Sequence, residues 1–182
     1  MTERIREQGS LAVRVVLVVA LALVLGAVAW AGSRTGDEAA APPPRSVPAS
    51  VFFTRGDPGA GCRRVFTRQR DVLAPGVLRG TLTKLLHGPT ATERRLGYGG
   101  WFSARTAGKL RSVRIAVGVA YVDFHDLRPL IPNASTSCGS ALLLAQLDRT
   151  AKQFPSVRRV VYSIESSRRT IYEWLQLPTP RT

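Results

Sequence analysis

Hydrophobic and polar positions follow their clearest pattern between residues 136 and 165. Up to Phe154, apolar residues recur at the spacing of one helical face, with polar residues on the opposite side. Ser137 or Ser140 can cap this helix by accepting a backbone N–H, and Pro155 ends it. Apolar and polar residues then alternate one by one, as in a strand. The pattern predicts a helix that leads directly into a strand and packs across its sheet.

The rest of the pattern predicts two hairpins and a second helix. Residues 50–56 and 62–70 flank a turn rich in glycine, and residues 110–126 turn at Val117-Gly118, where glycine supplies a positive φ. Leucines at helical spacing lie between the hairpins and stop at a Gly-Pro pair. We therefore expect an α+β fold, with one small mixed sheet of about four to five strands and two main helices packed on one face.

The N-terminal pattern predicts a membrane segment. Residues 1–14 are polar and basic, whereas residues 15–31 carry no charge. A helix over this run would be about 25 Å long, against roughly 30 Å for the hydrocarbon core. We expect a transmembrane helix or signal anchor at 15–31, behind a cytoplasmic N-terminal tail. Small residues up to Ala31 leave a second possibility, a cleaved signal peptide and a secreted protein. Either way, the basic flank predicts that the remaining chain lies outside the cytoplasm.

The expected order continues with a linker and one domain. Residues 32–49 are rich in proline and alanine, a composition typical of an extended, semi-rigid linker. We expect the folded domain in residues 50–177, followed by a C-terminal tail in residues 178–182. At 45% hydrophobic and 21% charged residues, the composition is that of a globular domain with one membrane segment added.

The chain is strongly basic, with a formal net charge of +14. Such a charge favours acidic partners, and a location outside the cytoplasm argues against nucleic acid. No stretch reaches the five or six like charges of a polybasic tail, so scattered arginines on a solvated face are one interpretation. The other is a face that binds anionic cell-wall polymer or lipid headgroups. Its candidate residues are Arg63, Arg64, Arg68, Arg70, Arg158 and Arg159.

Candidate chemistry is sparse. Cys62 and Cys138 favour a disulfide in an oxidising compartment, and the alternative is two unpaired thiols. The two cysteines could bind zinc only together with His87 and His125. These four residues lack the short spacings of a structural zinc site, so we expect no metal. Asp123 lies near His125 without a nucleophile spaced to join them, and the chain lacks G-x-S-x-G, S-x-x-K, H-E-x-x-H and phosphate-loop motifs. We expect no catalytic residues, no cofactor and no enzymatic activity.

Three separated blocks resemble, in order, the GerMN domain of spore-germination and sporulation proteins. They are a leucine-rich helix ending in Gly-Pro-Thr, a hairpin with Gly-Val-Ala-x-Val-Asp, and a Gln-x-x-x-Thr helix running through Gln-Phe-Pro into a strand. The matched positions are Gly88, Pro89, Thr90 and Glu93; Gly118, Val119, Ala120, Val122 and Asp123; and Gln146, Thr150, Gln153, Phe154, Pro155 and Val157. The resemblance covers residues 50–177.

The resemblance implies a fold similar to the ring-building motif of secretion-system proteins, in an extracytoplasmic, membrane-tethered module that is not an enzyme. It also implies partners among envelope or membrane proteins, in sporulation or germination. The chain departs from the family by having one such domain instead of two in tandem. Ser166-Ser167 also replaces the glycine that usually follows the last strand. We expect a partner to contact the polar back of the last long helix, at Asp148, Arg149 and Lys152.

Overall fold

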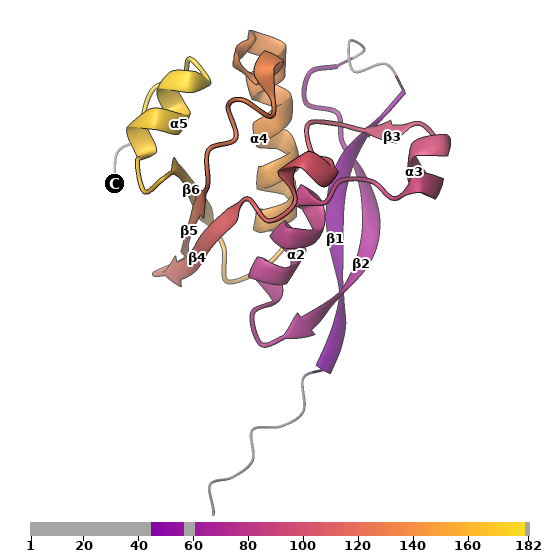
Figure 1. The fold of residues 1–182 in the computed structure, drawn as a ribbon. Coiled ribbons are helices and arrows are strands. Elements are labelled where there is room, and N and C mark those ends of the chain that lie inside the picture. Colours follow the sequence, from indigo (N-terminus) through magenta and orange to yellow (C-terminus); the bar gives the residue numbers. More distant parts are fainter. Residues whose placement is uncertain (1–44, 57–60, 181–182) are drawn as a thin grey trace, which may run out of the picture. The chain divides into compact units, whose positions relative to one another are not determined.

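The computed structural model describes residues 45–56 and 61–180 (Figure 1). The expected transmembrane helix at 15–31 and the cytoplasmic tail before it lie outside the described residues. Within the described ranges, no helix is both long enough and apolar enough to cross a membrane. The first strand begins at Arg45, inside the expected linker, so the folded domain starts earlier than the proline-rich composition suggested.

The elements follow the predicted order with short additions. Strands β1 (Arg45–Arg55) and β2 (Phe66–Ala74) form the first hairpin, and β4 (Leu110–Ala116) and β5 (Val119–Phe124) form the second. The main helices are α2 (Val77–Leu86) and α4 (Ser137–Lys152). The other elements are α3 (Ala91–Arg95), β3 (Tyr98–Gly99), the 3-10 turns η2 (Ala104–Thr106) and η3 (Pro132–Ser135), β6 (Arg159–Ile164) and α5 (Arg168–Trp174).

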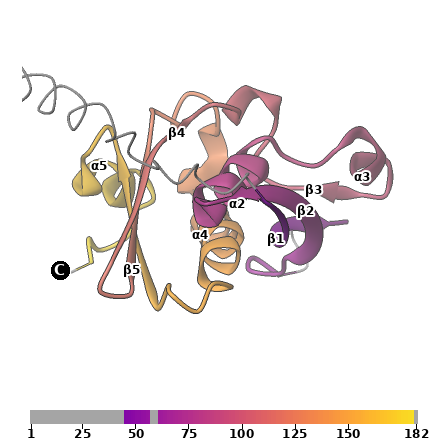
Figure 2. The same cartoon turned by 90° about the horizontal axis from the view of Figure 1, so that it is seen from below.

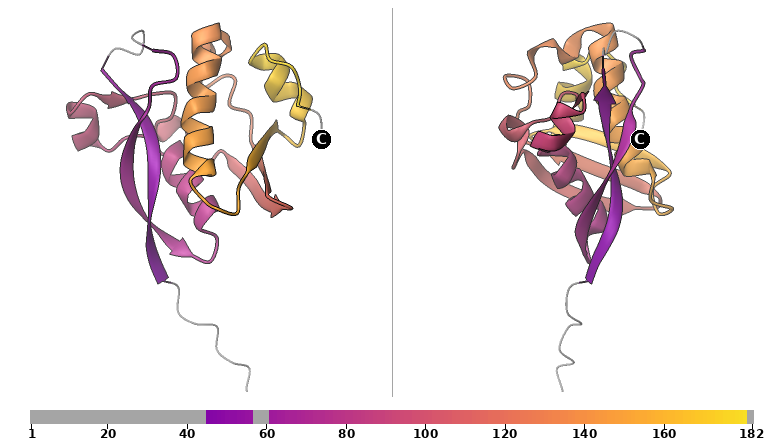
Figure 3. Two further views of the ribbon diagram at one scale, coloured as in Figure 1. Left: turned by 180° about the vertical axis from the view of Figure 1, so that it is seen from behind. Right: turned by 90° about the vertical axis from the view of Figure 1, so that its right-hand side faces the viewer.

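The α+β class is confirmed, but the prediction of one sheet is wrong, because the described strands form two three-stranded sheets. One sheet is antiparallel with the order β2–β1–β3, and the other has the order β4–β5–β6 with β5 and β6 parallel. Helices α2 and α4 pack against each other, and each contacts strands of both sheets (Figures 2 and 3). The helices therefore lie between the sheets and do not cover one face of a single sheet. Alternation predicts which side of a strand is buried, but not which strand pairs with it.

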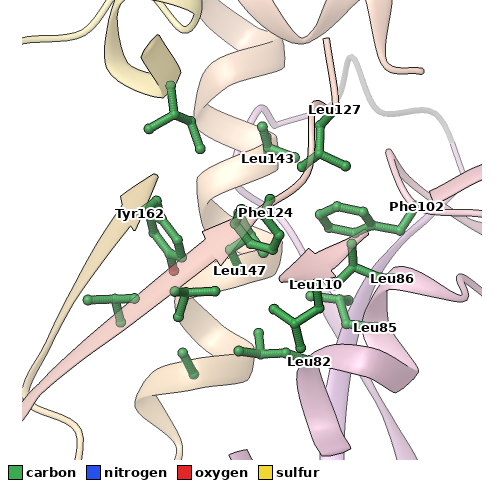
Figure 4. Close-up of a cluster of buried hydrophobic side chains, with 14 of the residues drawn as sticks. Leu82, Leu85, Leu86, Phe102, Leu110, Phe124, Leu127, Leu143, Leu147 and Tyr162 are labelled. Atoms are coloured by element: carbon green, nitrogen blue, oxygen red, sulfur yellow. The ribbon is translucent and has the colours of Figure 1, made fainter. Parts of the chain in front are cut away.

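The hydrophobic core fills the space around the two helices (Figure 4). Helix α4 contributes Leu143 and Leu147, which are fully buried as the helical spacing predicted. From the second sheet, the rings of Phe124 and Tyr162 stack with their centroids 6.2 Å apart. Phe102, in the glycine-rich loop of residues 96–109, is 2% exposed and closes the edge of the core. Helix α2 contributes the buried side chains of Leu78, Leu82, Leu85 and Leu86.

Glu93 fastens α3 to β2. Thr90 and Glu93 form a capping box, because Glu93 N donates to Thr90 Oγ1 at 3.2 Å and Thr90 N donates to Glu93 Oε2 at 2.8 Å. The same buried carboxylate accepts hydrogen bonds from Arg70 Nη1 at 2.8 Å and Arg68 Nε at 2.9 Å. Burial favours the neutral acid, but the bonds from Arg70, Thr90 and Arg68 prevail and lower the pKa of Glu93 to about 2.

Helix α4 covers an open edge of β1 with two side-chain amides. On the side away from β2, β1 pairs with β3 only at Thr54 and Arg55. Gln146 Nε2 donates to the carbonyl of Phe52 at 3.1 Å. Ser50 N donates to Gln153 Oε1 at 2.9 Å, and Gln153 Nε2 donates to Ser50 O at 2.6 Å. Two glutamines about two helical turns apart thus take the place of a missing neighbouring strand.

Gln146 also fixes the glycine-rich loop. Its Oε1 accepts a hydrogen bond from Trp101 N at 3.1 Å, so the fully buried amide joins α4 to two other segments. Gly100 approaches the amide closely with φ +135°, and a Cβ atom there would lie 2.3 Å from Gln146 Nε2. Only glycine allows this approach, since a side chain would collide with the amide.

We expect Gln146→Leu to lower the free energy of unfolding by about 2–4 kcal/mol, because two partly buried backbone groups, Phe52 O and Trp101 N, would lose their hydrogen bonds. Gln153→Leu is the matched control, because Gln153 is exposed and water can replace its amide. Its loss should be about 1 kcal/mol or less. Urea unfolding followed by circular dichroism measures both values. Equal losses in the two variants would contradict the special role of the buried amide.

We also expect Glu93→Gln to lower the free energy of unfolding at neutral pH by about 2–3 kcal/mol. The pKa of Glu93 is about 2 in the folded chain against an ordinary value of 4.5, so its stabilisation is complete above the ordinary value and is lost as the pH falls towards 2. The difference from the wild type should therefore shrink between about pH 4.5 and 2 in urea titrations. Glu173→Gln, which removes an exposed pair with Arg169, serves as the control and should cost less than about 1 kcal/mol.

Candidate functional site

A groove of about 650 Å³ lies along the solvent side of α4. Part of its lining is an apolar strip of Ala141, Leu144 and Ala145, which occupy one helical face at spacings of three and four residues. Leu177, which follows α5, adds apolar surface to the same groove, whereas Leu175 beside it is 1% exposed and belongs to the core. The polar residues of the lining are Arg63, Ser135, Ser137, Ser140, Asp148, Arg149, Lys152 and Gln176.

The predicted partner-contacting residues lie in the part of the groove beside the C-terminal half of α4. Asp148 accepts hydrogen bonds from the hydroxyl of Tyr162 at 2.8 Å and from Lys152 Nζ at 2.7 Å. Burial raises the pKa of Tyr162 well above its ordinary value, and Asp148 raises it further, so the phenol stays protonated and donates. Arg149 is exposed and has no ion-pair partner within the described residues. This end of the groove therefore offers a cation on a rigid helix.

The N-terminal end of α4 is built differently from our expectation. The cap is Thr136, whose Oγ1 accepts a hydrogen bond from Gly139 N at 3.0 Å. Ser140 is buried instead, and its hydroxyl contacts the carbonyl oxygens of Ala134 at 2.9 Å and Leu175 at 2.8 Å. The contact with Leu175 holds the segment after α5 beside α4, which creates the space between them.

Cys62 and Cys138 meet at this same end. Their Cα atoms lie 4.9 Å apart and their sulfur atoms 1.96 Å apart, a geometry compatible with the predicted disulfide. The bridge attaches the segment that precedes β2 to the first turn of α4. Arg63, the next residue along the chain, thereby becomes part of the groove lining.

The family model described as "Sporulation and spore germination", named Germane, matches residues 50–170. The chain belongs to the Germane family. The predicted recognition of a GerMN-like domain is thus confirmed. No curated protein matches the chain in sequence.

Three solved structures are similar to this Germane chain. The tandem GerMN domains of the sporulation protein GerM from Bacillus subtilis are 16% identical, with a TM-score of 0.48 over 74% of this chain and 43% of that one. The first GerMN domain of GerM alone is 15% identical, with a TM-score of 0.42 over 66% and 84% of the two chains. A putative lipoprotein from Clostridium perfringens is 18% identical, with a TM-score of 0.40 over 67% and 76%. This chain therefore spans less than half of the tandem-domain protein.

The six arginines of the predicted anionic face do not come together in this Germane domain. Those near β2 and those at the start of β6 belong to segments of different sheets, and α4 lies between the sheets (Figure 3). Two of them are already bound to the buried carboxylate of Glu93. Their positions are Arg63 at the groove, Arg64 over the ring of Phe66, Arg68 and Arg70 at Glu93, and Arg158 and Arg159 at the start of β6.

Asp123 joins the three strands of the second sheet. It accepts hydrogen bonds from Arg111 Nη1 at 2.6 Å, Ser163 Oγ at 2.6 Å and Ser166 N at 2.9 Å. Burial acts to raise the pKa of Asp123, but these bonds keep it below its ordinary value. His125 is exposed and contacts a different carboxylate, so no Asp–His pair forms. Among the described residues, no cluster of three or more His, Cys, Asp or Glu side chains could hold a metal ion.

We expect Cys62→Ser to leave one titratable thiol per chain, at Cys138. Opening a loop with a sequence separation of 76 should lower the free energy of unfolding by about 4–5 kcal/mol in the chain-entropy model. Thiol titration in denaturant, without reductant, measures the first effect, and urea unfolding measures the second. The wild-type chain is the control and should show no thiol under the same conditions. Two thiols in the denatured wild type would refute the bridge.

Proposed function

We propose that this Germane protein is a membrane-tethered module outside the cytoplasm, acting in sporulation or germination. It binds another envelope protein along the α4 groove and catalyses no reaction. The observation that carries the proposal is the apolar strip on the solvent side of α4, framed by cationic side chains. A helix that already buries one face in a core, yet keeps a second apolar strip at the surface, has the form of a docking site.

The lining of the groove favours a helical partner segment. Ala141 and Ala145 are small and four residues apart, so the backbone of a second helix can approach closely along this row. Leu144 and Leu177 then provide apolar contacts on the flanks. Such a partner would present apolar residues at spacings of three and four, which is how amphipathic helices are bound in grooves.

The charge of the lining favours an acidic partner. Arg63, Arg149 and Lys152 contribute three cations, and Asp148 contributes one carboxylate that is already bound to Lys152 and Tyr162. The groove therefore carries a net positive charge, which complements glutamate or aspartate on the polar side of a bound helix. Arginine is also one of the residue types that most often carry the binding energy of a protein contact.

We propose that the domain catalyses no reaction because its buried carboxylates are occupied by structural partners. Glu93 and Asp123 are the buried carboxylates of the described domain, and each is saturated by arginine and backbone donors that join segments of the fold. Groups with such partners stabilise the fold and are poorly placed to exchange protons with a substrate.

Site-specific photocrosslinking tests the groove in the intact chain. A photoreactive amino acid replacing Leu144 should yield a discrete protein adduct in cells, whereas one replacing the exposed Leu96 on the α3 side should not. Adding Ala145→Arg should reduce the Leu144 adduct at least tenfold, because the arginine fills the strip. Ala104→Arg, at an exposed site outside the groove lining, is the matched control and should leave the adduct unchanged.

Two results would contradict the proposal. One is an adduct at Leu144 that Ala145→Arg leaves unchanged while the variant melts within a few degrees of the wild type. The other is the recovery of wall polymer or lipid alone, without a stoichiometric protein.

A further inference from the structure

The turn between β4 and β5 presents apolar side chains to solvent. Val117 is 90% exposed and Ile115 is 42% exposed. Val117 also has φ +50°, a left-handed conformation that a β-branched residue rarely adopts. Asparagine followed by glycine would suit such a two-residue turn. Valine is therefore unfavourable here both for its exposure and for its backbone, and strained residues of this kind mark functional positions.

The turn is held rigidly by the start of β6. Gly118 O accepts hydrogen bonds from Arg158 N at 2.8 Å and from Arg159 N at 3.1 Å. The Arg158 side chain adds a bond from Nη2 to Val117 O at 3.2 Å. Gly118 has φ +76°, so a side chain at this position would be strained whatever the space around it. Val117 is thus presented by a fixed support, and docking it would cost little conformational entropy.

The segments around the turn carry positive charge and no negative charge. Residues 112–122 contain Arg114 and no acidic residue, and residues 153–164 contain Arg158 and Arg159 and no acidic residue. The Arg114 guanidinium lies 4.4 Å from the centroid of the Tyr121 ring. An apolar tip beside cations and an aromatic side chain is suited to bind at the boundary between the acyl chains and the anionic headgroups of a membrane.

We propose that this hairpin tip, residues 115–119 with Arg114 and Arg158, docks onto an anionic lipid bilayer. Val117 and Ile115 enter the acyl boundary, and the two arginines bind the headgroup phosphates. The tip shares no residue with the α4 groove, so the proposal does not depend on a protein partner at the groove. Each arginine should strengthen docking about fivefold at low salt.

The test uses the full chain in lipid nanodiscs, with a nitroxide label on a single introduced cysteine. Val117→Cys places the label on the tip, and Leu96→Cys places it on another exposed apolar position. Electron paramagnetic resonance then compares the collisions of each label with oxygen, which concentrates in lipid, and with a water-soluble nickel chelate. The wild-type chain, labelled in parallel, gives the background from Cys62 and Cys138.

In nanodiscs containing phosphatidylglycerol, we expect the label at position 117 to gain oxygen collisions and lose nickel collisions, while the label at 96 stays aqueous. Neutral phosphatidylcholine nanodiscs or high salt should abolish the difference. Replacing Arg114 and Arg158 with glutamine should weaken docking about 25-fold. A label at 117 that remains aqueous in anionic nanodiscs overturns the proposal. Equal docking in neutral nanodiscs, or spin–spin broadening from a second copy, also overturns it.

Discussion

The fold of this Germane domain depends on how α4 covers the edge of β1. Strand β1 is paired along its length with β2, but β3 covers only two residues of its other edge. The amides of Gln146 and Gln153 satisfy the backbone groups of Phe52 and Ser50 that would otherwise face the core or solvent. These hydrogen bonds set where α4 lies along β1. The helix must then separate the two sheets, and its remaining side becomes the lining of the groove.

Local features of the fold could be predicted from the sequence, whereas contacts between distant segments could not. The hairpins and the main helices depend on neighbouring residues, and all of them are present. The division into two sheets depends on the contact of α4 with β1. The bonds that make this contact join residues 94 and 103 positions apart, so no periodicity reveals them. Gln146 and Gln153 stood out as family-like residues, but nothing in the sequence indicated their partners.

Charge in the sequence was a poor guide to the candidate site. Arg68 and Arg70 looked like part of a surface for anions, yet they neutralise Glu93, which is 23 residues or more away in the chain. The apolar strip could have been found, because Leu144 lies outside the buried face of an otherwise regular helix. The unusual backbone of Val117 could not, since its positive φ follows from the support that β6 gives to the turn.

The two proposed surfaces place different demands on the same domain. The groove uses the solvent side of α4, and the hairpin tip uses the end of the second sheet, so one contact leaves the other open. A tether in the N-terminal segment would keep the tip near the bilayer at a high effective concentration, so that weak docking would suffice. Docking at a second point would then restrict how the domain rotates about such a tether. It would thereby limit the directions that the groove faces, and a partner held in the same membrane would bind at a lower entropic cost.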